Sequence, residues 1–164
     1  MSEALEIAHG AFGRVALLDM DRSLVRHAHP HCHVLLKVEG DDTQFLVGDQ
    51  VVALTDDQAV LINAWETHAY LHDPRRAKAM ILALYIEPNW LGAFRRNWAA
   101  SGAPGFFGQP SGAVTPTIHR LAHDLAAEMV YAPLSSHIQD ELLSNLMVAV
   151  IERFTAWREE PLSL

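Results

Sequence analysis

The chain has 164 residues, half of them hydrophobic and a fifth charged, which suits one globular domain with a sizeable core and not two full domains. It carries 12 Lys and Arg against 20 Asp and Glu, a formal net charge of −8, so it lacks the clustered positive charge with which proteins bind nucleic-acid phosphates. Its single cysteine excludes an internal disulfide and no segment indicates secretion or membrane insertion, so we expect a soluble cytoplasmic protein that contacts neither nucleic acid nor a membrane.

The first half of the chain is predicted to consist of β-strands. Short apolar or alternating runs are separated by turn residues, as in Gly40-Asp41-Asp42 and Asp73-Pro74, and no helical period lies between them. Many short strands favour an antiparallel β-barrel, or jelly roll, over a parallel sheet, and we assign the barrel to residues 1–87. The predicted strands cover residues 12–20, 34–39, 45–47, 51–54, 59–63, 67–72 and 79–86.

The second half, residues 88–164, is predicted to be a helical extension that packs on the barrel within the same domain. Thr115-Pro116 offers an N-cap and a first-turn proline for the first long helix, and a short connection predicts that the second long helix returns antiparallel to it. The predicted parts are a short helix over 88–100, a loop over 101–115 and the helix pair over 116–158.

The last predicted helix is apolar on two sides. A surface helix needs only one apolar stripe, so the second stripe is predicted to face a second copy of the chain, in a homodimer formed through the C-terminal helices. The alternative is that the barrel covers both stripes. One stripe is Ile138, Leu142, Leu146 and Val150, and the other is Leu143, Met147, Ile151 and Phe154.

Histidines alternate along residues 27–33, and His68 adds a further imidazole in a later predicted strand. Alternate side chains of an extended strand point the same way, so four imidazoles are expected to face the barrel interior. Converging neutral imidazoles favour Zn, Ni, Cu or Fe(II) over Mg or Ca. The alternatives are that they hydrogen-bond an organic ligand, or that Pro30 makes part of the segment a loop. The four alternating histidines are His27, His29, His31 and His33.

This pattern resembles the cupin superfamily, whose metal-binding members carry a His-x-His pair, then a carboxylate or amide, and a last histidine in a later strand. The resemblance implies one divalent transition metal (Zn, Ni or Fe) held by His27, His29, His33 and His68. The chain departs from the pattern because His33 replaces the usual Glu or Gln, and because Asn63-Ala64-Trp65-Glu66 lacks the usual Pro and Gly.

With or without a metal, the histidine cluster is expected to line a ligand pocket. Two aromatic residues near His68 are included among the candidate ligand contacts, although each has the simpler alternative of filling the barrel. The expected ligand-binding residues are His27, His29, His31, His33, Trp65, His68 and Tyr70.

A narrower resemblance extends over residues 10–157. An ordered set of segments resembles the N-terminal effector-binding and dimerization half of AraC-type transcriptional regulators. In chain order the set is Lys37-Val38-Glu39-Gly40, Ala59-Val60-Leu61-Ile62-Asn63, Ile86-Glu87-Pro88-Asn89-Trp90-Leu91, Phe106-Phe107 and two helices. The resemblance implies a ligand-sensing domain with a small-molecule effector, and a DNA-binding helix-turn-helix half that is not in this chain.

The alternative function is a free-standing metal-dependent cupin enzyme, an oxygenase or an isomerase acting on a small substrate. A helix-turn-helix region in frame after Leu164 would favour the regulator, and a stop codon there would favour the enzyme. Two further candidates are weaker: His119 and His123 lie one helical turn apart but suit a solvated helix face, and Cys32 is expected to pack as a small apolar group facing away from the histidines.

Overall fold

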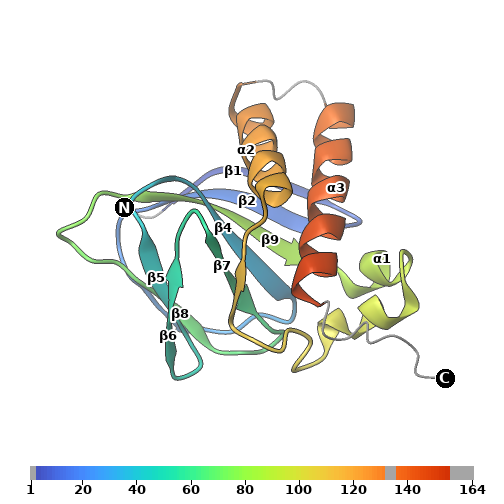
Figure 1. The fold of residues 1–164 in the computed structure, drawn as a ribbon, viewed down its shortest axis with the longest axis horizontal. Coiled ribbons are helices and arrows are strands. Elements are labelled where there is room, and N and C mark those ends of the chain that lie inside the picture. The colour runs from blue at the N-terminus through green and yellow to red at the C-terminus, as the bar shows by residue number, and fades with distance from the viewer. Residues whose placement is uncertain (1–2, 132–135, 156–164) are drawn as a thin grey trace.

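The computed structural model describes residues 3–131 and 136–155 (Figure 1). Among these residues, no helix combines the length and the apolar character needed to cross a membrane. The elements in chain order are β1 (Glu3–Gly10), β2 (Gly13–Met20), β3 (Leu24–His27), β4 (Cys32–Gly40), β5 (Thr43–Val47), β6 (Gln50–Leu54), β7 (Gln58–Ile62), β8 (His68–Leu71), β9 (Ala79–Ile86), α1 (Pro88–Gly92), the 3-10 helix η1 (Arg96–Gly102), β10 (Ser111–Ala113), α2 (Pro116–Tyr131) and α3 (Ser136–Phe154).

The strands form two antiparallel sheets. The larger sheet has the strand order β1-β2-β9-β4-β7-β10, and the smaller has the order β3-β8-β5-β6. Long sequence separations between neighbours, such as β2 beside β9 and β3 beside β8, are typical of a jelly roll, in which successive strands alternate between two sheets. This confirms the predicted fold class, a mainly β jelly roll followed by C-terminal helices.

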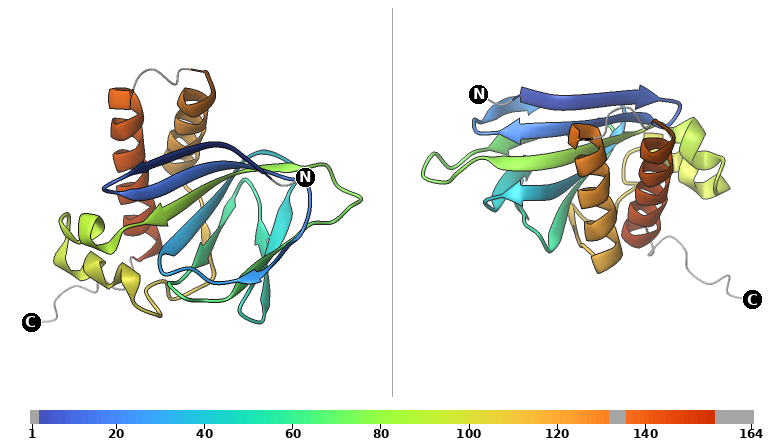
Figure 2. Two further views of the ribbon diagram at one scale, coloured as in Figure 1. Left: turned by 180° about the vertical axis from the view of Figure 1, so that it is seen from behind. Right: turned by 90° about the horizontal axis from the view of Figure 1, so that it is seen from above.

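The central strands β4, β7 and β9 of the larger sheet are buried on both faces. Alternate residues of β9 face opposite ways: Leu82 and Leu84 pack in a core shared with the helices, and Ile81 packs in a second core between the two sheets. Strands buried on both faces lose the polar alternation of a half-exposed strand, which explains the nearly unbroken apolar run of β9. Helices α2 and α3 lie side by side over the first of these faces (Figures 1 and 2).

The space between the two sheets is divided along the strands. At one end it is filled by apolar side chains that include Met20, Phe45 and Ile81, together with the buried ring of Tyr70. At the other end, where β4 begins and β9 ends, it holds imidazoles and the ring of Tyr85. The candidate site therefore lies at one end of a closely packed interior.

Residues 88–115 differ from the prediction. The single helix expected over 88–100 is two short ones, α1 and η1, because the chain folds back so tightly that a Cβ at Gly92 would lie 2.9 Å from Cβ of Ala99. The loop expected over 101–115 contains β10, which extends the larger sheet by pairing with β7. The predicted helix pair corresponds to α2 and α3, and the predicted end of its second helix, residues 156–158, lies outside the described residues.

Helix α3 buries both of its apolar stripes for much of its length. Leu146 and Val150 from one stripe and Met147 and Ile151 from the other all belong to the core shared with the larger sheet. Only the start of the first stripe is open, where Ile138 is 45% exposed. The alternative was that the barrel covers both stripes. In the C-terminal part of α3 both stripes are covered, by α2 as well as by the larger sheet.

Candidate ligand and metal site

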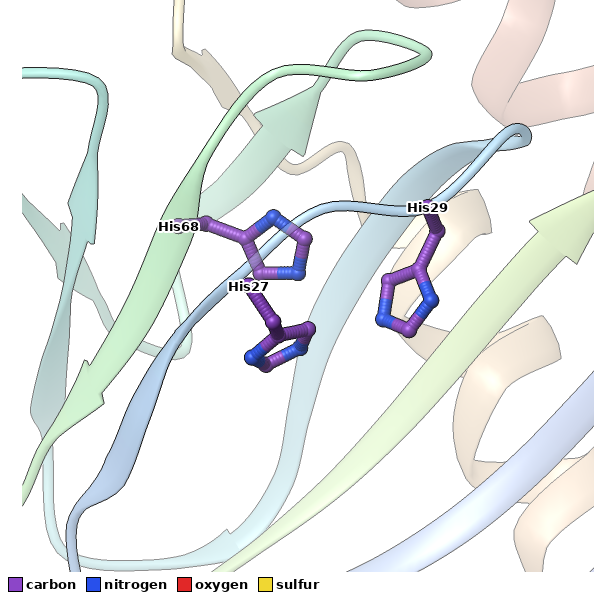
Figure 3. Close-up of side chains that lie close together, drawn as sticks. All are labelled: His27, His29 and His68. Carbon is purple, nitrogen blue, oxygen red and sulfur yellow. The ribbon is translucent and has the colours of Figure 1, made fainter.

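Three imidazoles converge between the two sheets (Figure 3). His27 ends β3 and His68 begins β8, and the two are directly paired across the smaller sheet, while His29 lies on the connection from β3 to β4. One ring nitrogen from each of the three lies within 4.8 Å of the others. Ring centroids are 4.3 Å apart for His27 and His68 and 4.7 Å apart for His27 and His29. Donors this close suit a single ion.

Hydrogen bonds to the backbone fix the orientation of two of these rings. Nδ1 of His27 lies 2.8 Å from the carbonyl oxygen of Val25, and Nδ1 of His68 lies 2.9 Å from that of Glu66. A carbonyl oxygen only accepts hydrogen bonds, so Nδ1 carries the proton in both rings and Nε2 keeps its lone pair. This is the arrangement typical of metal-bound histidines, in which the second nitrogen is held by a carbonyl or carboxylate.

His33 supplies a fourth imidazole beside the group of three. It comes from β4 in the larger sheet, and its ring lies 4.7 Å from that of His29 and 5.2 Å from that of His68, centroid to centroid. Its Nε2 is buried and has no hydrogen-bond partner among the described residues. A buried polar atom without a partner is costly, so this nitrogen is suited to a ligand or metal that enters the cluster. The donor set therefore fits a borderline transition metal.

The environment favours the neutral form of three of these imidazoles, those of His29, His33 and His68. Burial is the main cause that lowers the pKa of His29 to about 4, and the neighbouring His27, His68 and Arg14 lower it further. Burial also lowers the pKa of His33 and of His68, although the carbonyl of Glu66 partly opposes this at His68. Because metals bind the neutral form of imidazole, the lowered pKa values of His29, His33 and His68 favour coordination by these three rings.

A strained turn holds the loop that carries His29. Trp65 has φ of +63°, a left-handed conformation that glycine adopts most easily, and its backbone N–H donates to the carbonyl of His29 over 2.6 Å. The turn between β7 and β8 lacks the usual glycine, and Trp65 takes the left-handed conformation there. The Trp65 side chain is 62% exposed, so its ring does not fill the barrel.

The structure separates His31 from the other alternating histidines. Strand β3 ends at His27 and β4 begins at Cys32, so residues 28–31 are irregular and the expected alternation does not carry through Pro30. His31 instead pairs with Glu87, with Nε2 and Oε2 3.2 Å apart. The expectation that all four side chains share one face is therefore wrong for His31.

A pocket of about 400 Å³ lies directly beside the triad. His29 contributes to both, and the pocket also includes His31 and Glu87. Sequence reasoning identified only His29 and His31 among its lining residues and missed the others, of which Arg14 and Tyr85 bear most on ligand binding. Both lie in predicted strands, Arg14 in β2 and Tyr85 in β9. The sequence of each strand does not indicate that the two strands pair, nor that Arg14 stands opposite Tyr85. The full lining is His9, Gly10, Gly13, Arg14, His29, Pro30, His31, Tyr85 and Glu87.

The remaining candidates lie away from the triad. Tyr70 is buried at the apolar end of the interior, where its hydroxyl is hydrogen-bonded to Thr43 and His72, so it has the simpler role of filling the barrel. Cys32 packs in the core on the helix side of β4, as expected, and burial raises the pKa of its thiol to about 12.

The second histidine pair lies on α2. Nε2 of His119 and Nε2 of His123 are 3.1 Å apart, within hydrogen-bond distance, and both side chains are half-buried. Among the described residues this pair forms no group of three donors, in contrast to the triad. Because two imidazole nitrogens lie this close together, a metal titration of the triad needs a control variant at this pair.

Comparisons with known proteins find similarity in sequence and in fold. Residues 14–147 match the protein family described as the AraC-like ligand binding domain. A cupin superfamily protein from Desulfitobacterium hafniense is 18% identical, with a TM-score of 0.42, over 53% of this chain and 77% of that one. A cupin-2 domain protein from Shewanella frigidimarina is 17% identical, with a TM-score of 0.41, over 53% and 80%. A variant of the salicylate 1,2-dioxygenase from Pseudoaminobacter salicylatoxidans is 17% identical, with a TM-score of 0.40, over 50% and 23%. No curated protein matches the chain.

Proposed function

Because the chain belongs to the family of AraC-like ligand binding domains, we propose that it is the ligand-sensing and dimerization domain of an AraC-type transcriptional regulator. The observation that carries the proposal is the imidazole triad at one end of the jelly-roll interior, beside a pocket of about 400 Å³. A pocket of this size with a few convergent polar groups is suited to a small organic molecule, which we take to be the effector.

The proposal includes one divalent transition metal, Zn, Ni or Fe, held by the triad of His27, His29 and His68 with His33 beside it. When bound, such an ion supplies a positive centre to which an oxygen or nitrogen of the effector can bind. The chain's own contribution is orientation, because the hydrogen bonds from His27 and His68 to backbone carbonyls present Nε2 to the ion. The proposed ligand contacts exclude Tyr70, which packs at the apolar end of the interior, and Trp65, whose side chain is exposed.

Dimerization is proposed to involve the end of the helix pair at which α2 stops and α3 begins. Large apolar side chains are exposed there: Val130 by 42%, Tyr131 by 85% and Ile138 by 45%. Apolar side chains gathered at one end of a protruding helix pair are typical of a contact surface. The proposal assigns DNA binding to a separate helix-turn-helix region, because this chain carries a net charge of −8. It places the regulator in the cytoplasm.

One observation favours a second candidate function, a metal-dependent enzyme acting on a small substrate. The converging donors number three, and three protein ligands leave coordination positions open, as catalytic metal sites require. The pocket that shares His29 with the triad would give a substrate access to those positions. Turnover of a pocket ligand by the metal-loaded protein distinguishes the two functions, because a sensor releases its effector unchanged.

Metal titration tests the site. Metal-free protein titrated with Zn²⁺ in competition with a chromophoric chelator should bind one ion tightly, and His27→Ala and His68→Ala should each weaken this binding by about ten-fold or more, as loss of a ligand does. The His123→Ala variant is the matched control, because it disrupts the pair on α2 and leaves the triad intact. Equal zinc affinity in the wild type and both triad variants would refute the assignment.

Sedimentation velocity tests the dimer. At tens of micromolar the chain should sediment as a dimer, and Tyr131→Ser, which removes an exposed apolar ring, should shift it towards the monomer. A wild-type monomer at that concentration would remove dimerization from the proposal.

A further inference from the structure

The pocket beside the triad contains a cation, Arg14, that forms no ion pair with a carboxylate of the described residues. Arg14, half-buried on β2, has its guanidinium carbon 3.9 Å from the centroid of the Tyr85 ring, over the face of that ring. Within residues 3–131 and 136–155, its side chain forms no ion pair and no hydrogen bond. Its N–H donors are therefore available to a ligand, while Tyr85 holds the guanidinium in place.

The sheet register places Arg14 in a row of polar and aromatic side chains. His9 on β1 stands opposite Arg14 on β2, Arg14 stands opposite Tyr85 on β9, and Tyr85 stands opposite His33 on β4. Directly opposed residues of an antiparallel sheet project from the same face. The row therefore runs along one face of the larger sheet, from the exposed His9 at its edge strand to the buried His33 beside the triad.

The one carboxylate in the pocket is already engaged. Glu87 accepts a hydrogen bond at the start of α1 from the backbone N–H of Asn89, and its other oxygen lies 3.2 Å from Nε2 of His31. Its charge is thus partly compensated without Arg14. This leaves the guanidinium as the group in the pocket that still needs a negative partner.

We propose that this pocket binds a small organic monocarboxylate, with its carboxylate on the guanidinium of Arg14 and its carbon skeleton extending along Tyr85 towards the triad. The planar fork of N–H donors in arginine matches the two oxygens of a carboxylate. A single uncompensated cation suits one negative charge better than the two of a phosphate monoester. The apolar surfaces of Tyr85 and Pro30 suit a hydrocarbon or aromatic skeleton.

This inference deepens the proposed function, on which it rests, by giving the effector a chemical class. It also assigns Arg14 a role in binding that is independent of the metal, since the guanidinium cannot be a metal ligand. Arg14 and the triad thus supply two separate anchors, and His29 connects them because it both lines the pocket and belongs to the triad.

Calorimetric titration with matched pairs of probes tests the proposal. The probes are acetate and acetamide, benzoate and benzamide, and phenylacetate and phenylacetamide, each added to metal-free and to zinc-loaded protein. At least one carboxylate should bind, and its neutral amide should bind about ten-fold more weakly or worse, because a hydrogen bond to a charged group is worth that factor or more. Arg14→Gln should weaken the carboxylate by a similar factor, and Arg14→Lys by less, because lysine keeps the charge and loses the fork.

Arg120→Gln is the matched control, because Arg120 is an exposed arginine on α2 outside the pocket. Melting temperatures of all variants show whether a loss of binding reflects loss of the fold. The proposal is overturned if no carboxylate binds, if the amides bind equally well, or if folded Arg14→Gln protein binds a carboxylate as the wild type does. If zinc still binds and the chain still dimerizes in that case, the sensing domain stands and only the anionic class of effector falls.

Discussion

Acidification should destabilise the metal-free protein because of His29. Its pKa is about 4 in the folded chain and 6.5 in the ordinary imidazole. Between these values the unfolded chain binds a proton at His29 that the folded chain does not bind, so the free energy of unfolding falls as the pH drops from 6.5 towards 4. Above pH 6.5 both states are neutral, and below pH 4 both are protonated, so His29 contributes no further change outside this window.

The size of the effect follows from the shift. A difference of about 2.5 pKa units corresponds to roughly 3 kcal/mol at most, and solvent screening at a half-buried ring reduces this to about 1–2 kcal/mol. His33 and His68 act in the same direction, because burial lowers the pKa of each. The metal-free wild type should therefore lose at least about 1 kcal/mol of unfolding free energy between pH 7 and pH 5.

Urea unfolding in the presence of a chelator measures this loss. His29→Asn removes the titrating ring and should make the unfolding free energy less dependent on pH, whereas Val51→Ala, which shortens an exposed side chain that does not titrate, should leave the dependence unchanged. Equal pH dependence in wild type and His29→Asn, or a wild type whose stability is constant from pH 7 to pH 5, would show that His29 is not held neutral by the fold.

Two further predictions concern stability. Trp65→Gly should change the unfolding free energy by less than about 1 kcal/mol, because relief of the left-handed backbone offsets the greater freedom of glycine, whereas Trp98→Ala at a fully buried ring should cost roughly 3–5 kcal/mol. Urea unfolding at pH 7.5 compares the two variants, and equal losses of unfolding free energy would contradict the exposures of the two side chains. Gly13→Ala should lower the unfolding free energy by more than about 2 kcal/mol, because Gly13 has φ of +118° and a Cβ there would clash with the carbonyl of Tyr85. The same urea unfolding measures this loss, and a variant as stable as the wild type would show that the two strands do not approach so closely at Gly13.

The sequence was informative where burial imposes a pattern. Strands β4, β7 and β9 are buried on both faces, so their apolar runs stand out between turn residues. Strands β3 and β10 were not predicted, because β3 is four residues long and mostly exposed, and β10 is three residues that include a glycine. Strand β1, also not predicted, is an edge strand paired only with β2, so packing on neighbours on both sides does not shape its sequence.

The candidate site was predictable only in part, for a related reason. Alternation along one segment singled out four histidines, and resemblance to the cupin pattern selected His27, His29 and His33 among them. The irregular residues around Pro30 direct His31 towards Glu87. Arg14 and Tyr85 are brought to the site by pairing between strands far apart in the sequence, and pairing register is a property of the folded sheet. The residues of the larger sheet that a ligand would contact could therefore be identified only from the structure.

The larger sheet is a wall one backbone thick between the ligand pocket and the helices. Along β9, Tyr85 lines the pocket while its neighbours Leu84 and Ile86 point the other way, into the layer on which α2 and α3 rest. Protein interiors are closely packed, so a ligand that displaces the Tyr85 ring and tilts β9 is also expected to move Leu84 and Ile86, which pack in the core shared with both helices. If the protein is a sensor, β9 is therefore the element through which we expect ligand binding in the pocket to affect the packing of α2 and α3.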